Sequence, residues 1–257
     1  MPTNRGKARD YGNPYLAAGA EHAYHDVRPS YPEQAILWAL EGVTARAAVA
    51  DIGAGTGKLT AQLAELGYRV WAVEPAAQMR AEFERALPRF SPRRLVAASG
   101  EATGLAPGAY AAVTYGQSWH WLDPAAASAE AARILQPKGV LAVFVNQLAV
   151  EEPWVHRLSR IMRSGDVAKL SQAPELGPTF GQAEAFECSW SAAVTPEEIV
   201  DLGTTRASWI RASEAQRAKM RQNLTWYLYE HLGFEPGRHI ELPYHTYVWR
   251  AHSISSE

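Results

Sequence analysis

Apolar residues in the first part of the chain occur as short continuous runs that alternate with helical spacings. Residues 47–52 are apolar apart from one aspartate and contain no glycine or proline, which predicts a strand buried on both faces. Apolar residues then recur at the spacing of one helix face, and Gly67 marks the end of that helix. Residues 69–73 predict a second strand, so this stretch forms one βαβ unit. The leucines of the helix face are Leu59, Leu63 and Leu66.

The same alternation continues to about residue 150. Apolar runs at 95–98, 109–115 and 140–146 predict three further strands, and residues 124–135 predict a helix between the last two. Strands that alternate with helices at this spacing indicate an α/β fold with a parallel, doubly wound sheet. Ligands of such sheets bind at the carboxyl ends of the strands.

Beyond residue 150 the pattern changes to mainly helical segments. We expect helices at 153–169 and 214–231, and a helix start capped by Thr195. Residues 186–192 and 241–250 read as strands that pair antiparallel with each other. The expected organisation is given by three ranges: N-terminal lid helices at 1–40, a ligand-binding core at 41–150, and cap helices with the last two strands at 151–257.

The turn after the first strand has an unusual combination of glycines and acids. Gly53, Gly55 and Gly57 allow a ligand to approach the backbone, and Glu74 lies 19 residues after Gly55, a spacing that suits ribose hydroxyls. The dinucleotide fingerprint and the Walker loop both require other glycine spacings. Asp51 would repel a pyrophosphate but attract an ammonium group. A ligand with a ribose, an amino-acid end and no phosphate fits both acids, and S-adenosylmethionine is such a ligand.

Several segments resemble motifs of the class I S-adenosylmethionine-dependent methyltransferases. The turn at 51–57 and the pair Glu74-Pro75 resemble motifs I and II, and 99–102 resembles motif III. Residues 115–122 resemble the segment after strand 4, and 135–142 the turn before strand 5. Residues 28–32 and the His-Trp pair at 120–121 resemble the small-molecule subgroup, methyltransferase type 11, which includes trans-aconitate methyltransferase-like proteins. The resemblance implies a Rossmann-like, seven-stranded, mostly parallel sheet with the last strand antiparallel, an N-terminal helical lid and a helical cap.

The resemblance also implies roles for individual residues around the cofactor. Glu74 would bind the ribose hydroxyls, Asp51 the methionine ammonium group, and Glu101 the adenine amino group. Met79 could pack on the adenine. The competing interpretations are a purely structural turn role for Asp51, a surface loop acid at Glu101 and a core position for Met79. Arg28 would bind the carboxylate of the cofactor or of an acidic substrate. The residues expected to bind the cofactor are Arg28, Asp51, Gly53, Ala54, Gly55, Gly57, Glu74, Pro75, Met79, Gly100, Glu101, Ala102, Tyr115 and Gln117.

Aromatic residues at the end of the fourth strand predict where the acceptor binds. Trp119 and Trp121 can stack on a planar acceptor or be ordinary core anchors, and His120 can relay a proton. The family pattern at residue 245 has an arginine where this chain has His245, which argues against an anionic acceptor. The nine Trp and eleven Tyr residues of the chain favour an aromatic or heteroaromatic acceptor. Indole-containing natural products, methylated on carbon or nitrogen, are the specific hypothesis. The residues expected to bind the acceptor are Tyr11, Tyr15, Trp119, Trp121, Tyr244 and His245.

A base is required if the acceptor loses a proton. Glu21, Tyr24 and His25 share one face of a helix in the lid and, with His120, are the candidate catalytic residues; a solvated helix face is the alternative. Carboxylate O-methylation of the trans-aconitate type, which needs no base, and a non-catalytic S-adenosylmethionine-binding module remain alternative functions.

Charge and composition limit the partners. The net charge is −2 with no dense basic tract, so nucleic acid is not expected as the main partner. Cys188 is the single cysteine, which excludes an intramolecular disulfide and favours a reducing compartment. No apolar stretch reaches about 18 residues and the N-terminus has no apolar signal core, so we expect no membrane span. A cytoplasmic monomer or homodimer without a metal site, acting on a small-molecule acceptor, is the expectation.

Overall fold

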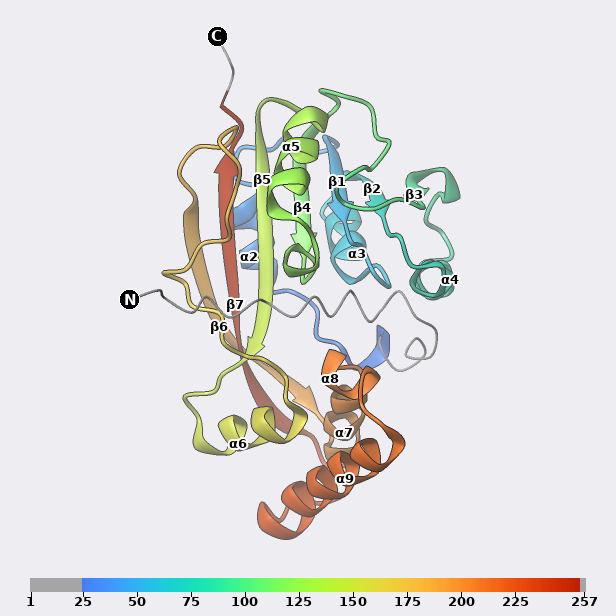
Figure 1. The fold of residues 1–257 in the computed structure, drawn as a ribbon, viewed down its shortest axis with the longest axis vertical. Helices are drawn as coiled ribbons and strands as arrows, with labels where there is room; N and C mark the ends of the chain where they lie inside the picture. Colours follow the sequence, from blue (N-terminus) through green and yellow to red (C-terminus); the bar gives the residue numbers. More distant parts are fainter. Residues whose placement is uncertain (1–24, 255–257) are drawn as a thin grey trace, which may run out of the picture.

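The computed structural model describes residues 25–254, and these form one seven-stranded sheet (Figure 1). The strand order is β3-β2-β1-β4-β5-β7-β6, in which β7 runs antiparallel to both β5 and β6. The predicted α/β fold and its antiparallel last strand are therefore confirmed. The strands are β1 (Ala48–Ile52), β2 (Arg69–Val73), β3 (Leu95–Val96), β4 (Tyr110–Gly116), β5 (Leu135–Leu148), β6 (Glu184–Val194) and β7 (Ile240–His252).

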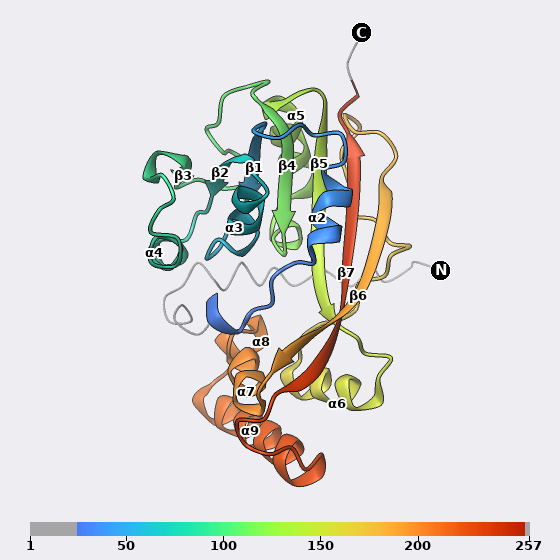
Figure 2. The same cartoon turned by 180° about the vertical axis from the view of Figure 1, so that it is seen from behind.

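Helices cover both faces of the sheet because its central strands are apolar on both sides. α5 packs on one face through Ala127, Ala131 and Ile134, in front of the sheet in Figure 1. α2 and α3 cover the opposite face through Ile36 and Leu63, in front in Figure 2. The helices of the core are α2 (Glu33–Ala39), α3 (Lys58–Glu65), α4 (Ala77–Ala86) and α5 (Pro124–Ile134).

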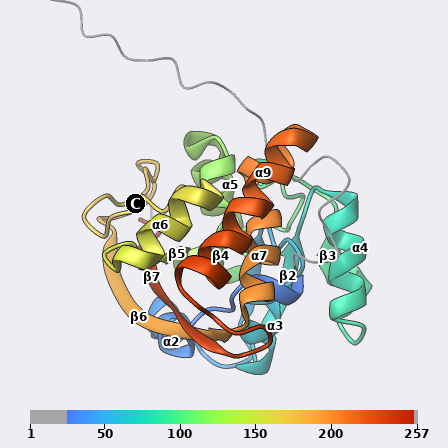
Figure 3. The ribbon, with the colours of Figure 1, turned by 90° about the horizontal axis from the view of Figure 1, so that it is seen from below.

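A second group of helices forms a cap beyond the carboxyl ends of the strands, at the bottom of Figure 1 and nearest the viewer in Figure 3. Its own apolar core joins Leu158, Leu202 and Leu224 to Leu148 at the end of β5 and Leu242 at the start of β7. The long strands β5 and β7 thus connect the cap to the sheet. The cap helices are α6 (Pro153–Met162), α7 (Pro196–Thr204), α8 (Ala207–Ile210) and α9 (Glu214–Thr225), and α9 continues into a π-helical turn at Trp226–His231.

Helix and strand limits differ from the sequence patterns in explicable ways. Thr195 caps α7 as predicted, in a capping box with Glu198. The helix predicted at 153–169 ends at Met162, because Arg163 adopts a left-handed conformation (φ 50°). β5 begins at Leu135, five residues earlier than its apolar run, because Leu135 already pairs with Tyr110 of β4, before a register shift in the ladder. Between residues 25 and 254, no helix combines the length and apolar character needed to cross a bilayer.

Candidate functional site

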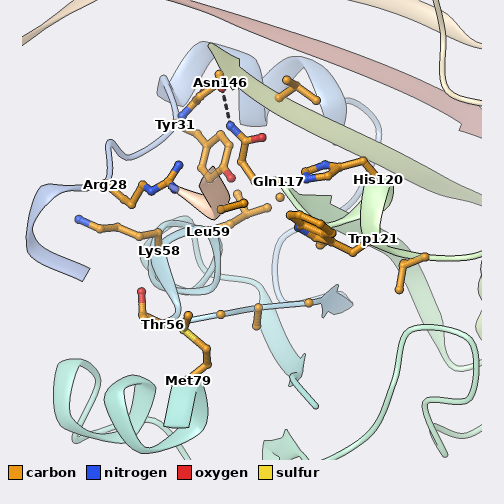
Figure 4. A pocket seen from close by; sticks show the side chains of 18 of the residues that line it. Arg28, Tyr31, Thr56, Lys58, Leu59, Met79, Gln117, His120, Trp121 and Asn146 are labelled. Atoms are coloured by element: carbon orange, nitrogen blue, oxygen red, sulfur yellow. Dashed lines mark hydrogen bonds between the residues drawn. The ribbon is translucent and has the colours of Figure 1, made fainter. Parts of the chain in front are cut away.

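A cavity of about 760 Å³ opens between the carboxyl ends of the strands and the cap (Figure 4). Its walls come from the turns after β1, β2 and β4, from the end of β5, from the segment before α2 and from the α7–α8 junction. This position agrees with the rule for open α/β sheets. Eleven of the predicted cofactor residues line it: Arg28, Asp51, Gly53, Ala54, Gly55, Glu74, Pro75, Met79, Gly100, Glu101 and Gln117.

Each of the three positions in the turn after β1 requires glycine for a different physical reason. All three adopt positive φ, between 56° and 89°, which favours glycine. A side chain at Gly55 would meet nothing within 4 Å, so the backbone here faces open space. A Cβ at Gly53 would lie 2.4 Å from the Cβ of Ser118, and one at Gly57 would lie 2.8 Å from the Phe83 ring. Gly55 therefore allows close approach of a ligand, whereas Gly57 serves packing and does not line the cavity, which corrects its predicted ligand contact.

Glu74 joins the tip of β2 to the glycine turn. Its Oε2 accepts a hydrogen bond from Gly55 N (2.9 Å) and its Oε1 one from Ala76 N (2.8 Å). Burial raises the pKa of Glu74, while these two amide donors act in the opposite direction. Each carboxylate oxygen can accept more than one bond, and the residue lines the cavity. The carboxylate is therefore held in place by the backbone and still available to a ligand.

Asp51 lies deeper in the same wall and is 1% exposed. Its carboxylate accepts hydrogen bonds from Thr60 Oγ1 (2.5 Å) and Thr114 Oγ1 (3.1 Å), so it ties β1 to α3 and to β4. Burial raises its pKa to about 6, although both hydroxyl donors favour the ionised form. Asp51 thus has the structural role considered above, and it also contributes a buried carboxyl group to the cavity wall.

The end of β4 forms the opposite wall. Gln117 has φ 57°, an uncommon conformation for a residue with a side chain, and its Nε2 donates to the carbonyl of Asn146. Asn146 in turn donates to Ser30 O (3.0 Å) and accepts from Thr246 Oγ1 (2.6 Å). These bonds connect β4, β5, β7 and the segment before α2 around the cavity, and Figure 4 draws the one between Gln117 and Asn146.

His120 and Trp121 lie in the 3-10 helix Trp119–Trp121, and both line the cavity. Their rings are 4.5 Å apart between centroids, and they lie on the same side of the cavity in Figure 4. His120 exposes part of its surface there. Desolvation of the ring lowers the pKa of His120 to about 4, and the positive charge of Arg28 acts in the same direction. The imidazole is therefore neutral at pH 7.

The side chains of two aromatic residues, Tyr115 and Trp119, point away from the cavity that they were predicted to line. Tyr115 is 0% exposed and its hydroxyl donates to Ala127 O (3.5 Å) of α5, so it belongs to the core and not to the cofactor site. Trp119 packs edge-on against Tyr115 (4.7 Å between centroids) and does not line the main cavity. Tyr115 lies in β4, where successive residues point to opposite faces, and Trp119 begins the 3-10 helix after it. The pattern of 115–122 alone did not reveal which side chains were buried.

Two further predicted residues also lie away from the cavity. The amide of Ala102 donates to Ser99 O (3.3 Å) in a local turn, and the residue is exposed. His245 faces the outer side of β7, where its ring contacts the carboxylates of Glu151 and Glu187. Its neighbour Tyr244 lines the cavity, and its contact with an acceptor stays a prediction.

The predicted lid residues are only partly described. Tyr11, Tyr15, Glu21 and Tyr24 lie outside the described residues. His25 does not line the described cavity, but its Nδ1 lies 3.1 Å from Thr56 Oγ1 in the glycine turn. Its pKa is lowered, first by burial and then by Lys58.

Sequence reasoning missed several residues that line the cavity. Thr56 lies in the glycine turn and Lys58 is the first residue of α3. Burial lowers the pKa of the lysine. Arg206 comes from the cap and Asp166 from the loop after α6, far along the chain from any motif. Lys58 was visible as the residue after the last glycine, whereas no signal in the sequence pointed to the other two.

Comparisons with known proteins agree with this geometry. The family model described as "Methyltransferase domain", of type 11, matches residues 50–143. An uncharacterized methyltransferase of Mycobacterium tuberculosis is 34% identical over 230 residues, covering 89% of this chain and 92% of the relative. An uncharacterized methyltransferase of Schizosaccharomyces pombe is 28% identical over 209 residues, covering 78% of this chain and 82% of the relative.

A solved methyltransferase-fold structure from Anaeromyxobacter dehalogenans superposes with a TM-score of 0.62 at 22% identity, covering 88% of this chain and 97% of that one. This likeness shows the fold, and the mycobacterial relative shows the family. The chain therefore belongs to the type 11 family of class I S-adenosylmethionine-dependent methyltransferases.

Proposed function

We propose that this methyltransferase acts on a small aromatic acceptor, best represented by an indole-containing natural product methylated on carbon or nitrogen. The observation that supports the proposal is a cavity with two kinds of lining residue. Its lining combines Asp51, Gly55 and Glu74 of the strand-end turns with the aromatic side chains of Trp121 and Tyr244. Cofactor and acceptor would therefore meet in one cavity, and holding them in line is the main requirement of a displacement reaction.

The strand-end turns fit S-adenosylmethionine. Glu74 has carboxylate oxygens beside the open space over Gly55, suited to ribose hydroxyls, and Asp51 suits an ammonium group. Met79 and Glu101 also line the cavity, and in this proposal they contact the adenine. When bound, S-adenosylmethionine supplies an electrophilic methyl group on a sulfonium. The residues of this chain need only hold that group and the acceptor in line.

The aromatic part of the lining suits a planar acceptor. The indole of Trp121 offers a face for stacking, and burial raises the pKa of Tyr244 to about 12, so its phenol stays protonated and can donate a hydrogen bond. His120 is neutral and lines the cavity, so it can hydrogen-bond the acceptor, but a pKa lowered to about 4 makes it a weak base at neutral pH. A relay through Glu21, Tyr24 and His25 stays a prediction.

The test is conversion of S-adenosylmethionine to S-adenosylhomocysteine in the presence of a panel of indoles, phenols and amines, with the products identified by mass spectrometry. We expect turnover with at least one indole and none with the cofactor alone. Tight cofactor binding without turnover on any member of the panel would contradict the proposal and favour the non-catalytic module.

A further inference from the structure

A second, smaller cavity of about 240 Å³ adjoins the main cavity. Its walls come from the segment after β4, from β5 and β7, and from the loop 163–183 between α6 and β6. The two cavities have four lining residues in common: Gln117, Ser118, His120 and Val145. Of these, His120 is exposed, and Gln117 and Val145 are half-buried. The boundary between the two spaces is therefore not a closely packed wall.

Two tryptophans line the second cavity and are held by the protein itself. Trp119 is 7% exposed and packs edge-on against Tyr115. Trp249 of β7 is 3% exposed, and its Nε1 donates to Leu170 O (3.0 Å). A ligand that enters this space would meet a preformed aromatic surface. Trp119, which does not line the main cavity, can contact a ligand here.

The loop 163–183 contributes to both cavities. Ala168 lines the main cavity, whereas Gln172 and Pro174 line the second. The amide of Ala168 donates to Gln147 Oε1 (2.9 Å) near the end of β5, and the Leu170 carbonyl accepts the bond from β7 described above. Both strands thus hold the loop, and a ligand that spans the two cavities would contact it in each.

The second cavity suits an apolar group. Among the described residues that line it, none is charged at pH 7, since His120 is neutral. Gln117 Nε2 already donates to Asn146 O, and Ser118 Oγ donates to Ile52 O (2.6 Å). A polar substituent would lose its water there and find few partners, whereas an apolar one would gain from burial. An apolar cavity of about 150 Å³ can hold a benzene ring, so this one has room for a ring-sized group.

We propose that the acceptor has two parts: the ring system that is methylated, beside Trp121 in the main cavity, and an apolar, ring-sized substituent that enters the second cavity and packs against Trp119 and Trp249. This inference rests on the proposed function, because it concerns the acceptor of the same reaction. It narrows the substrate class from a simple indole to an aromatic ring system with an apolar side group. His120, which lines both cavities, would lie at the junction of the two parts.

The test compares indole with 2-phenylindole, 3-phenylindole and 5-phenylindole by equilibrium dialysis against protein saturated with S-adenosylhomocysteine. Saturation keeps the probes out of the cofactor site. We expect at least one phenylindole to bind about tenfold or more tightly than indole, because burial removes the phenyl ring from water. Gln172→Trp introduces a bulky ring at an exposed loop position that lines the second cavity and not the main one, and should bring this affinity ratio close to one. Val143→Phe, which fills the same cavity from β5, should do the same.

The matched control is Gln222→Trp, at an exposed position of α9 that lines neither cavity, and it should keep the wild-type ratio. Unchanged affinity for S-adenosylhomocysteine shows that a variant is folded. Equal binding of indole and all three phenylindoles would overturn the inference, as would a ratio that survives in both Gln172→Trp and Val143→Phe or falls equally in Gln222→Trp. If neither indole nor any phenylindole bound, the aromatic acceptor of the proposed function would itself be refuted, and this inference with it.

Discussion

Replacing Glu74 by alanine removes the carboxylate that closes the tip of β2. In the proposed complex this carboxylate accepts hydrogen bonds from the ribose hydroxyls. Hydrogen bonds to a charged partner contribute about 1.5–3 kcal/mol, so the affinity for S-adenosylhomocysteine should fall about 10- to 150-fold. The same change should weaken ligands that contain the ribose and leave free methionine unaffected.

The variant also changes the stability of the unliganded protein. The amides of Gly55 and Ala76 lose the acceptors to which they now donate at 2.9 and 2.8 Å. An unsatisfied buried donor costs about 1–3 kcal/mol. Removing a carboxylate whose pKa burial has raised offsets part of this loss. We therefore expect a net destabilisation of about 1–3 kcal/mol, visible as a modest drop in Tm.

Calorimetric titration with S-adenosylhomocysteine gives the affinity, and thermal unfolding without ligand gives the stability. Glu84→Ala is the matched control, because Glu84 is an exposed acid on neighbouring α4. A Glu74→Ala protein that is folded and binds S-adenosylhomocysteine with wild-type affinity would refute the assignment of this residue to the ribose. An equal loss in Glu84→Ala would show that the effect is one of net charge.

Three further changes test other parts of the site. Asp51 has a pKa near 6 and attracts an ammonium group only when ionised, so the affinity for S-adenosylhomocysteine should fall as the pH drops below about 6. The variant Asp51→Asn should flatten this pH dependence. A wild-type affinity that does not change with pH would contradict the prediction. Gly53→Ala should destabilise the protein by about 1–3 kcal/mol in denaturant titrations, because its Cβ would lie 2.4 Å from that of Ser118; wild-type stability would show that the turn can move. Trp121→Leu should raise the KM for the acceptor severalfold in turnover assays while cofactor affinity stays constant. The control is Trp226→Leu, which changes a cap tryptophan that is 42% exposed and should leave this KM unchanged. Equal effects of the two variants would argue against stacking of the acceptor on Trp121.

The cofactor end could be predicted from sequence because its parts are local. The βαβ unit, its glycine turn and the acid after β2 lie within 30 residues, and their geometry follows from one strand-turn-helix connection. The doubly wound, mostly parallel sheet followed from the alternation of elements, and its antiparallel last strand from the family resemblance. The roles of the three glycines could not be separated, because the clashes that distinguish Gly53 and Gly57 from Gly55 involve residues from other segments.

The acceptor end could not be predicted because it depends on side-chain direction and on distant segments. Tyr115 and His245 differ from their cavity-facing neighbours by one strand position, and only the packed sheet determines which face each occupies. Arg206 reaches the cavity because the cap folds back over the strand ends. Its surroundings in the sequence contain no motif, so tertiary structure alone reveals it.

The most direct measurement of the central claim is a calorimetric comparison of S-adenosylmethionine with NAD and ATP as ligands of the purified protein. The paired acids Asp51 and Glu74 around the open turn at Gly55 should select a ribose and an ammonium group and disfavour phosphates. We therefore predict saturable binding of S-adenosylmethionine at one site per chain, and no measurable binding of NAD or ATP. Uptake of either phosphate-containing nucleotide, with S-adenosylmethionine ignored, would contradict the account.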